Sequence, residues 1–177
     1  MKTIKELRTV LDFYPQEINS QVSHFAKHSN IDFEVFLPSI NKNLQRNFVW
    51  TIDQKRELIW SMLMKRNISR MSMVNTVDDV YQIIDGKQRL SSMIDFYNNE
   101  YTLLIDGKEY LFKELPKDYQ TSIGGYFFAY VIVNEDYDDK ITDSQKMNWF
   151  KFINFAGTPQ DADHLRSLTS QINTPAI

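Results

Sequence analysis

The sequence predicts a mixed α+β domain in which helices surround a small mixed β-sheet. Segments with apolar residues at helical spacing intermingle with short runs rich in β-branched and aromatic residues. The chain has 177 residues, 42% hydrophobic and 14% aromatic, which is long enough for a full core and too apolar for disorder. No linker, repeat or low-complexity tract divides it. We therefore expect residues 1–177 to form a single domain.

The first 30 residues are expected to form a helical extension. A first helix ends before Pro15, because proline cannot continue a helix. A second helix is predicted from apolar residues that share one face: Ile18, Val22, Phe25 and Ala26. Alternation of apolar and polar residues then predicts a strand over 31–37. This strand opens the expected core of the domain, residues 31–170.

Local signals mark the starts and turns of the later elements. Thr51 and Gln54 have the spacing of a capping box, and Asp143 is placed to cap another helix. Asp106-Gly107 lies between two β-type runs and favours a hairpin with a type I′ turn. The same periodicities predict strands over 71–75, 80–84 and 126–133, and helices over 52–65, 86–98, 114–123, 143–154 and 160–171.

Composition excludes several classes of function. The chain has no cysteine, which rules out disulfides and thiolate chemistry and fits a cytoplasmic location. No apolar run is long enough for a membrane span. The formal net charge of −3 argues against a domain that depends mainly on non-specific DNA contacts. His24 and His28 lack a third ligand, and the acidic 136–139 stretch lacks the pattern of a calcium loop, so no protein-held metal is expected.

One stretch, Tyr81–Leu90, has the pattern of a strand, a tight turn and a helix start. The first turn of a helix has unpaired N–H groups and the positive end of the helix dipole, so it attracts anions. Gly86 lets the backbone approach a ligand closely, Arg89 can fork onto a phosphate, and Lys87 adds a charge. The stretch predicts a phosphate-binding corner for a nucleotide. An Asp-Gly turn before an ordinary surface helix is the alternative that this pattern alone leaves open.

Four segments occur in a characteristic order along the chain. They are NLQRNFVW at 43–50, QKRELI at 54–59, IDGKQRL at 84–90 and INFAGTP at 153–159. With these segments the chain resembles the N-terminal domain of GmrSD-type modification-dependent restriction endonucleases, within the ParB/sulfiredoxin-like superfamily. The resemblance covers roughly 30–170 and rests on all four motifs together.

The resemblance implies an NTP-binding and often NTP-hydrolysing domain that acts in DNA-modification sensing, restriction and phage defence. Asp85 would position metal or water, Gln88 would bond substrate or water, and Arg89 would act with Arg46 as a phosphate clamp. Magnesium is expected to arrive with the phosphates. The implied site comprises catalytic Asp85, Gln88 and Arg89, and nucleotide-binding Gln45, Arg46, Gly86, Lys87, Arg89, Asn154, Gly157 and Thr158.

The chain departs from the family pattern at several points. Lys87 stands where the family commonly has glutamine, Phe152 where many relatives have arginine, and Ala156 where they have glycine. The absence of cysteine excludes sulfiredoxin chemistry. No His-Asn-His nuclease pattern is present, so we expect a stand-alone form of the domain.

Two other functions stay open at this point. The fold can serve as a catalytically silent module of phage or mobile-element origin that binds DNA or a partner protein, or as a magnesium-dependent DNA nicking enzyme. The expected partners are a nucleotide and either DNA or a separate nuclease or defence protein. The sequence leaves the preferred nucleotide and the oligomeric state undetermined.

Overall fold

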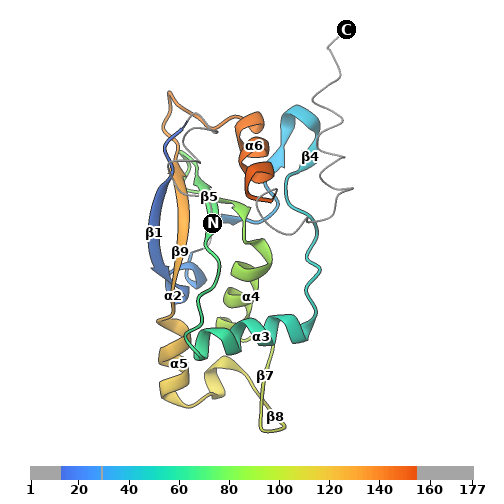
Figure 1. Ribbon diagram of the computed structural model, residues 1–177, viewed down its shortest axis with the longest axis vertical. Helices are drawn as coiled ribbons and strands as arrows, with labels where there is room; N and C mark the ends of the chain where they lie inside the picture. The colour runs from blue at the N-terminus through green and yellow to red at the C-terminus, as the bar shows by residue number, and fades with distance from the viewer. Residues whose placement is uncertain (1–12, 29, 155–177) are drawn as a thin grey trace.

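The computed structural model describes residues 13–28 and 30–154, and a five-stranded mixed sheet lies at their centre (Figure 1). The strand order is β1-β9-β5-β6-β2. The β1–β9 and β5–β6 pairs are antiparallel, and the β9–β5 and β6–β2 pairs are parallel. The strands are β1 (Gln16–Gln21), β2 (Ile31–Asp32), β5 (Met71–Asn75), β6 (Tyr81–Asp85) and β9 (Phe127–Asn134).

Helices accompany the sheet, and the structure confirms the predicted α+β class. They are α2 (Val22–Ala26), α3 (Ile52–Leu63), α4 (Lys87–Tyr97), α5 (Lys117–Gly124) and α6 (Asp143–Asn154), with short 3₁₀ turns η1 (Pro38–Ile40) and η2 (Phe112–Glu114). Two small ribbons, β3 (Phe36–Leu37) with β4 (Lys42–Asn43) and β7 (Leu103–Ile105) with β8 (Lys108–Tyr110), extend the fold. In Figure 1, α5 and the β7–β8 hairpin lie at one end of the long axis and α6 at the other.

The sheet separates two buried clusters because successive side chains of a strand point to opposite faces. Met73 and Ile83 belong to the cluster that α2, α3, α4 and α5 cover. The neighbouring Val74 and Ile84 belong to the cluster beneath α6, which surrounds the fully buried Trp149. Burying each such apolar side chain contributes roughly 1.5–3 kcal/mol before entropy is counted. The sheet is therefore fixed from both faces, and its strand ends are rigid places for a site.

Several locally encoded features are confirmed. The Thr51 hydroxyl accepts from the Gln54 N–H at 3.3 Å, and the Gln54 side chain accepts from the Thr51 N–H at 2.9 Å, which completes the capping box of α3. Asp106 and Gly107 both have positive φ, 48° and 78°, as a type I′ turn requires.

Three expectations about the elements are wrong. Residues 16–21 form the strand β1 where a helix containing Ile18 was expected, because this segment pairs with β9 along its whole length. The expected strand over 31–37 is broken. The Asp32 carboxylate accepts from the N–H groups of Glu34 and Val35, and this turn leaves Val35 at φ 52°. Such a side-chain turn competes with a strand ladder.

The third correction concerns the start of α6. Thr142, not Asp143, forms the cap, because its hydroxyl accepts from the Gln145 N–H at 3.2 Å. The Asp143 carboxylate instead accepts from the Ser39 N–H at 2.9 Å and ties η1 to α6.

Some predictions lie outside the described residues. These are the helix before Pro15, the helix over 160–171 and the site residues Gly157 and Thr158. Among the helices that are described, none is long and apolar enough to cross a membrane.

Candidate functional site

The N-terminus of α4 lies where the sequence predicts a phosphate-binding corner. Strand β6 ends at Asp85, Gly86 turns the chain, and α4 begins at Lys87. The carbonyl of Gly86 accepts the first helical bond, from the Leu90 N–H at 2.8 Å. No side chain caps this helix start. The predicted order of strand, turn and helix is thus confirmed, and the first N–H groups of α4 are left for a ligand or water.

Gly86 is required at this turn for two reasons. Its φ is +103°, a region that side chains rarely adopt. A Cβ placed there would also lie 2.6 Å from Cγ of the buried Met71. The backbone of the turn is therefore pressed against β5 without room for a side chain.

A second segment, 45–50, crosses the end of β6 and faces the α4 N-terminus. The buried Gln45 donates its Nε2 hydrogens to the carbonyls of Ile83 and Ile84, at 2.6 and 2.7 Å. Further along, Gln88 Oε1 accepts from the N–H groups of Val49 and Trp50, at 2.9 and 3.1 Å. Two glutamine amides thus fix the segment to β6 and α4.

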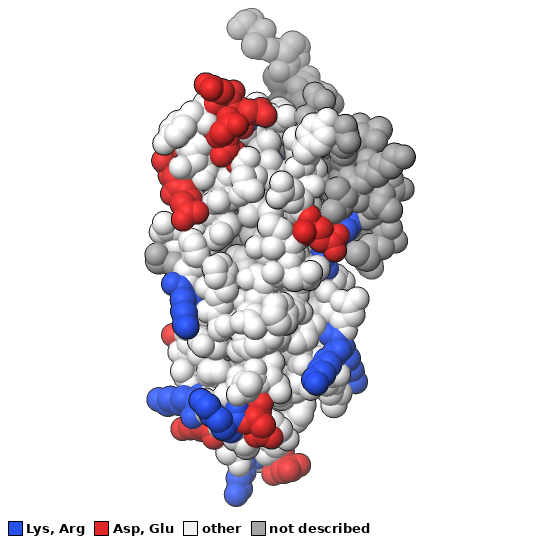
Figure 2. All heavy atoms as spheres, turned by 90° about the vertical axis from the view of Figure 1, so that its left-hand side faces the viewer, with Lys and Arg blue, Asp and Glu red and all other residues white. Residues whose placement is uncertain are grey.

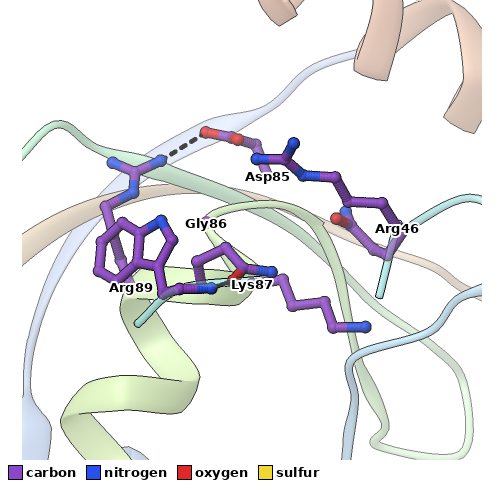
Figure 3. Close-up of a pocket in the computed structure, with 8 residues that line it drawn as sticks. Arg46, Asp85, Gly86, Lys87 and Arg89 are labelled. Carbon is purple, nitrogen blue, oxygen red and sulfur yellow. Dashed lines mark hydrogen bonds and ion pairs between the residues drawn. The ribbon is translucent and has the colours of Figure 1, made fainter. Parts of the chain in front are cut away.

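Together the two segments form a pocket of about 410 Å³, counting its space open to solvent. Figure 3 shows the residues around it. Its described lining consists of Gln45, Arg46, Trp50, Asp85, Gly86, Lys87, Gln88 and Arg89. The structure therefore brings together seven of the predicted site residues, from segments about 40 positions apart.

Arg89 is held firmly within this pocket. Its NH2 donates to Asp85 Oδ2 at 2.7 Å, one turn earlier (Figure 3). Its NH1 donates to the carbonyl oxygens of Ser69 and Arg70. These contacts fix the plane of the guanidinium and leave its Nε–H and one NH2 hydrogen for another acceptor.

Lys87 contributes its backbone to the pocket, but its side chain is engaged elsewhere. The side chain is only 6% exposed, and its ammonium nitrogen lies 2.5 Å from Oε1 of Glu34. In Figure 3 the side chain runs away from Arg46 and Arg89. The predicted contribution of this ammonium to phosphate binding stays a prediction.

Arg46 differs from the other arginines of the described residues. Arg56, Arg66, Arg70 and Arg89 each form an ion pair with a carboxylate. Arg46 is half-buried at the pocket and makes no hydrogen bond or ion pair within residues 13–28 and 30–154. In the view of Figure 3, its guanidinium and that of Arg89 lie on either side of the Asp85 carboxylate.

Comparison with protein families identifies the family of the chain. Residues 24–173 match the family described as GmrSD restriction endonuclease, N-terminal domain, and the match covers most of the 177 residues. The chain belongs to this family. No curated protein and no solved structure matches it.

In this GmrSD N-terminal domain, Asn154 is not among the described residues that line the pocket. Asn154 is buried at the end of α6, and its Nδ2 donates to the Phe150 carbonyl at 2.8 Å. Its predicted role beside a nucleotide is therefore carried over from the family alone. No group of three potential metal-ligating side chains is found among the described residues of this domain.

Sequence reasoning missed two residues of this GmrSD-type site. Trp50 packs partly against the larger core cluster and also lines the pocket. Glu34 neutralises Lys87 from the turn after β2. The VW pair of the first motif was a signal for Trp50. No local pattern marks Glu34, because its partner lies 53 residues away.

Proposed function

We propose that the pocket binds the phosphate groups of a nucleoside triphosphate. The observation that carries this proposal is the half-buried Arg46, without a partner in the described residues, beside the uncapped N-terminus of α4. A half-buried guanidinium that forms no ion pair among the described residues favours an anion, and helix N–H groups favour the same ligand. Gly86 lets that ligand approach the backbone closely.

Hydrolysis of the bound NTP is the second part of the proposal. Asp85 Oδ2 is used by Arg89, while Oδ1 makes no hydrogen bond within the described residues. This oxygen is a suitable ligand for a magnesium ion carried by the phosphates, or for an attacking water. The remaining donors of Arg89 would stabilise charge that develops on the transferred phosphoryl group.

Gln88 has a different role in this proposal from the one that the family motif suggests. Its Oε1 accepts two backbone N–H groups and its Nε2 lies 3.4 Å from the Asn47 carbonyl. We assign it as a positioning residue that holds the 47–50 segment. Gln45, which bonds the end of β6, serves the same purpose.

Trp50 offers a surface for the nucleoside. It lines the pocket and also a shallow groove along α3 with Gln54, Glu57, Leu58 and Ser61. A nucleotide whose phosphates lie at α4 would extend its base toward this groove, where an indole supplies a flat stacking surface.

The family match supports a context of restriction and phage defence for this pocket. We propose that nucleotide binding in the cytoplasm is coupled to recognition of DNA or of a separate nuclease. A catalytically silent binding module is the second candidate. It is favoured by one observation: Gln88 and most donors of Arg89 already bond the protein itself.

Release of phosphate from the four common NTPs with magnesium tests the proposal. We expect turnover by the wild type and its loss in both Arg46→Ala and Arg89→Ala. Turnover that survives both substitutions would overturn the assignment of the pocket. Nucleotide binding without turnover in the wild type would favour the silent module.

A further inference from the structure

A second hollow lies where the C-terminal ends of α3 and α5 meet the start of β9. It encloses about 930 Å³, counting space open to solvent, and shares no residue with the α4 pocket. Its lining includes Lys65, Arg66, Asn67, Ser122, Tyr126 and Phe127. We call it the α3–α5 hollow.

Several polar groups in the α3–α5 hollow are available to a ligand. The side chains of Lys65, Asn67 and Ser122 are exposed and make no hydrogen bond or ion pair among the described residues. Arg66 lies 3.3 Å from Glu57, but the two side chains are 58% and 69% exposed, so water and salt screen this pair. The hollow therefore presents two cations with weak or no local neutralisation, next to an amide and a hydroxyl.

The same hollow also presents aromatic rings. Phe127 is 63% exposed, a high value for a large apolar side chain at the start of a buried strand. The adjacent Tyr126 is fixed in place, since its hydroxyl donates to the Arg66 carbonyl at 2.6 Å. This bond also ties the segment that holds the cations to the segment that holds the rings. An exposed ring beside cations is the combination that proteins use to stack a base and hold its phosphate.

Lysine and arginine side chains gather at one end of this side of the molecule. Figure 2 views the protein from the β1 side of Figure 1; the upper end of this face is acidic, and most of its lysine and arginine side chains lie in the lower half, with acidic side chains among them. The lower half is the end of the molecule at which α5 lies in Figure 1.

We propose that the α3–α5 hollow binds a nucleotide unit. Phe127 stacks on the base, Lys65 and Arg66 contact its phosphate, and Asn67 and Ser122 bond polar groups of the base or sugar. The unit can come from a single nucleic-acid strand or from a free nucleotide, which offer the same chemistry. This site is separate from the NTP pocket, and its existence does not depend on NTP binding at α4.

Fluorescence anisotropy of the full chain with a labelled single-stranded DNA of 12 nucleotides tests the proposal. We expect Phe127→Ala and Lys65→Glu each to weaken binding about tenfold. Matched controls come from outside the hollow: Tyr137→Ala removes an aromatic residue that is 81% exposed, and Lys140→Glu reverses an exposed cation. Both controls should bind like wild type. Neutralisation of the one phosphate of the bound unit predicts a slope of log K against log salt concentration of about −0.7.

Competition by free thymidine monophosphate distinguishes the two sources of the ligand. Displacement of the labelled DNA by a comparable concentration of the monophosphate supports a free nucleotide as the ligand, and failure to displace the DNA supports a strand. Either conclusion requires that Phe127→Ala weakens the interaction. Absence of DNA binding would overturn the proposal, and so would an equal loss of DNA affinity in the control variants. Displacement of the DNA by poly-glutamate, together with no effect of Phe127→Ala, would also overturn it. Because the readout does not involve NTP, failure of the α4 pocket to bind nucleotide leaves this test intact.

Discussion

The backbone N–H of Trp50 donates to Oε1 of Gln88 at 3.1 Å and so joins the segment after β4 to the first turn of α4. The same oxygen accepts from the Val49 N–H at 2.9 Å. Arg46, four residues before Trp50, is thereby held opposite the α4 N-terminus. A residue of the DGKQR motif thus acts on the geometry of the pocket through the backbone of a distant segment.

Gln88→Leu is expected to loosen this segment. Two backbone N–H groups lose their acceptor, so the free energy of unfolding should fall by about 1–2 kcal/mol and nucleotide affinity should fall with it. Urea unfolding and nucleotide titration measure the two effects. Gln88→Glu keeps an acceptor and should retain the stability. Normal nucleotide affinity in Gln88→Leu would show that the segment does not need this bond.

Gly86→Ala is expected to cost much more stability than Gly107→Ala. Both glycines have positive φ, which costs about 1–2 kcal/mol for alanine. Only at Gly86 does the added Cβ meet another side chain, Met71, whereas nothing lies within 4 Å at Gly107. We expect a total loss of at least about 3 kcal/mol for Gly86→Ala, measured by urea unfolding. Equal losses for the two variants would contradict the close packing of the turn against β5.

Lys87→Met tests whether the ammonium belongs to Glu34 or to the ligand. Its bond to Glu34 predicts a change of about 1 kcal/mol or less in the free energy of unfolding, because half of the Glu34 side chain is exposed. Nucleotide affinity should change less than about threefold, since methionine keeps the backbone N–H at the α4 N-terminus. A tenfold loss of affinity would instead place the ammonium on the phosphates.

Alkaline pH is expected to destabilise the fold through its tyrosines. Burial raises the pKa of Tyr101, Tyr126 and Tyr130 above the ordinary value of 10.0. The unfolded chain therefore releases phenolic protons above about pH 10 that the folded chain retains. The stabilisation is fully present below that pH and is lost as the pH rises beyond it.

Urea unfolding between about pH 8 and pH 11 measures this loss. The Tyr101 hydroxyl donates to the Ser92 carbonyl at 2.9 Å, so Tyr101→Phe should be about 1 kcal/mol less stable at the lower pH. Its stability should then decline less steeply than that of the wild type. Stability that does not change over this range would contradict the burial of these hydroxyls.

The parts of the fold that the sequence predicts well are those that neighbouring residues determine. The capping box at Thr51, the Asp106-Gly107 turn and the Gly86 corner each depend on residues within one turn of the chain. Strand β1 was missed because its conformation depends on pairing with β9, where Ile18 meets Tyr130. Val35 was placed in a strand because its positive φ follows from the Asp32 carboxylate rather than from its own preference.

In the site, too, motifs of the sequence predict some features, whereas contacts between distant segments determine others. Motif order was enough to group Arg46 with Asp85 and Arg89, and the structure places them at one pocket. The uses of Gln45 and Gln88 could not be predicted, because their partners are backbone groups 38 to 41 residues away. No periodicity or local motif marks such a contact.

Isothermal titration of a non-hydrolysable triphosphate with magnesium tests the central claim most directly. Loss of a charge-assisted contact predicts that Arg46→Ala binds roughly 10- to 100-fold more weakly than the wild type. The control Lys140→Ala removes an exposed charge outside the pocket and should bind as the wild type does. Circular dichroism should show that both variants are folded. Unchanged affinity in folded Arg46→Ala would contradict the assignment of this pocket as the nucleotide site.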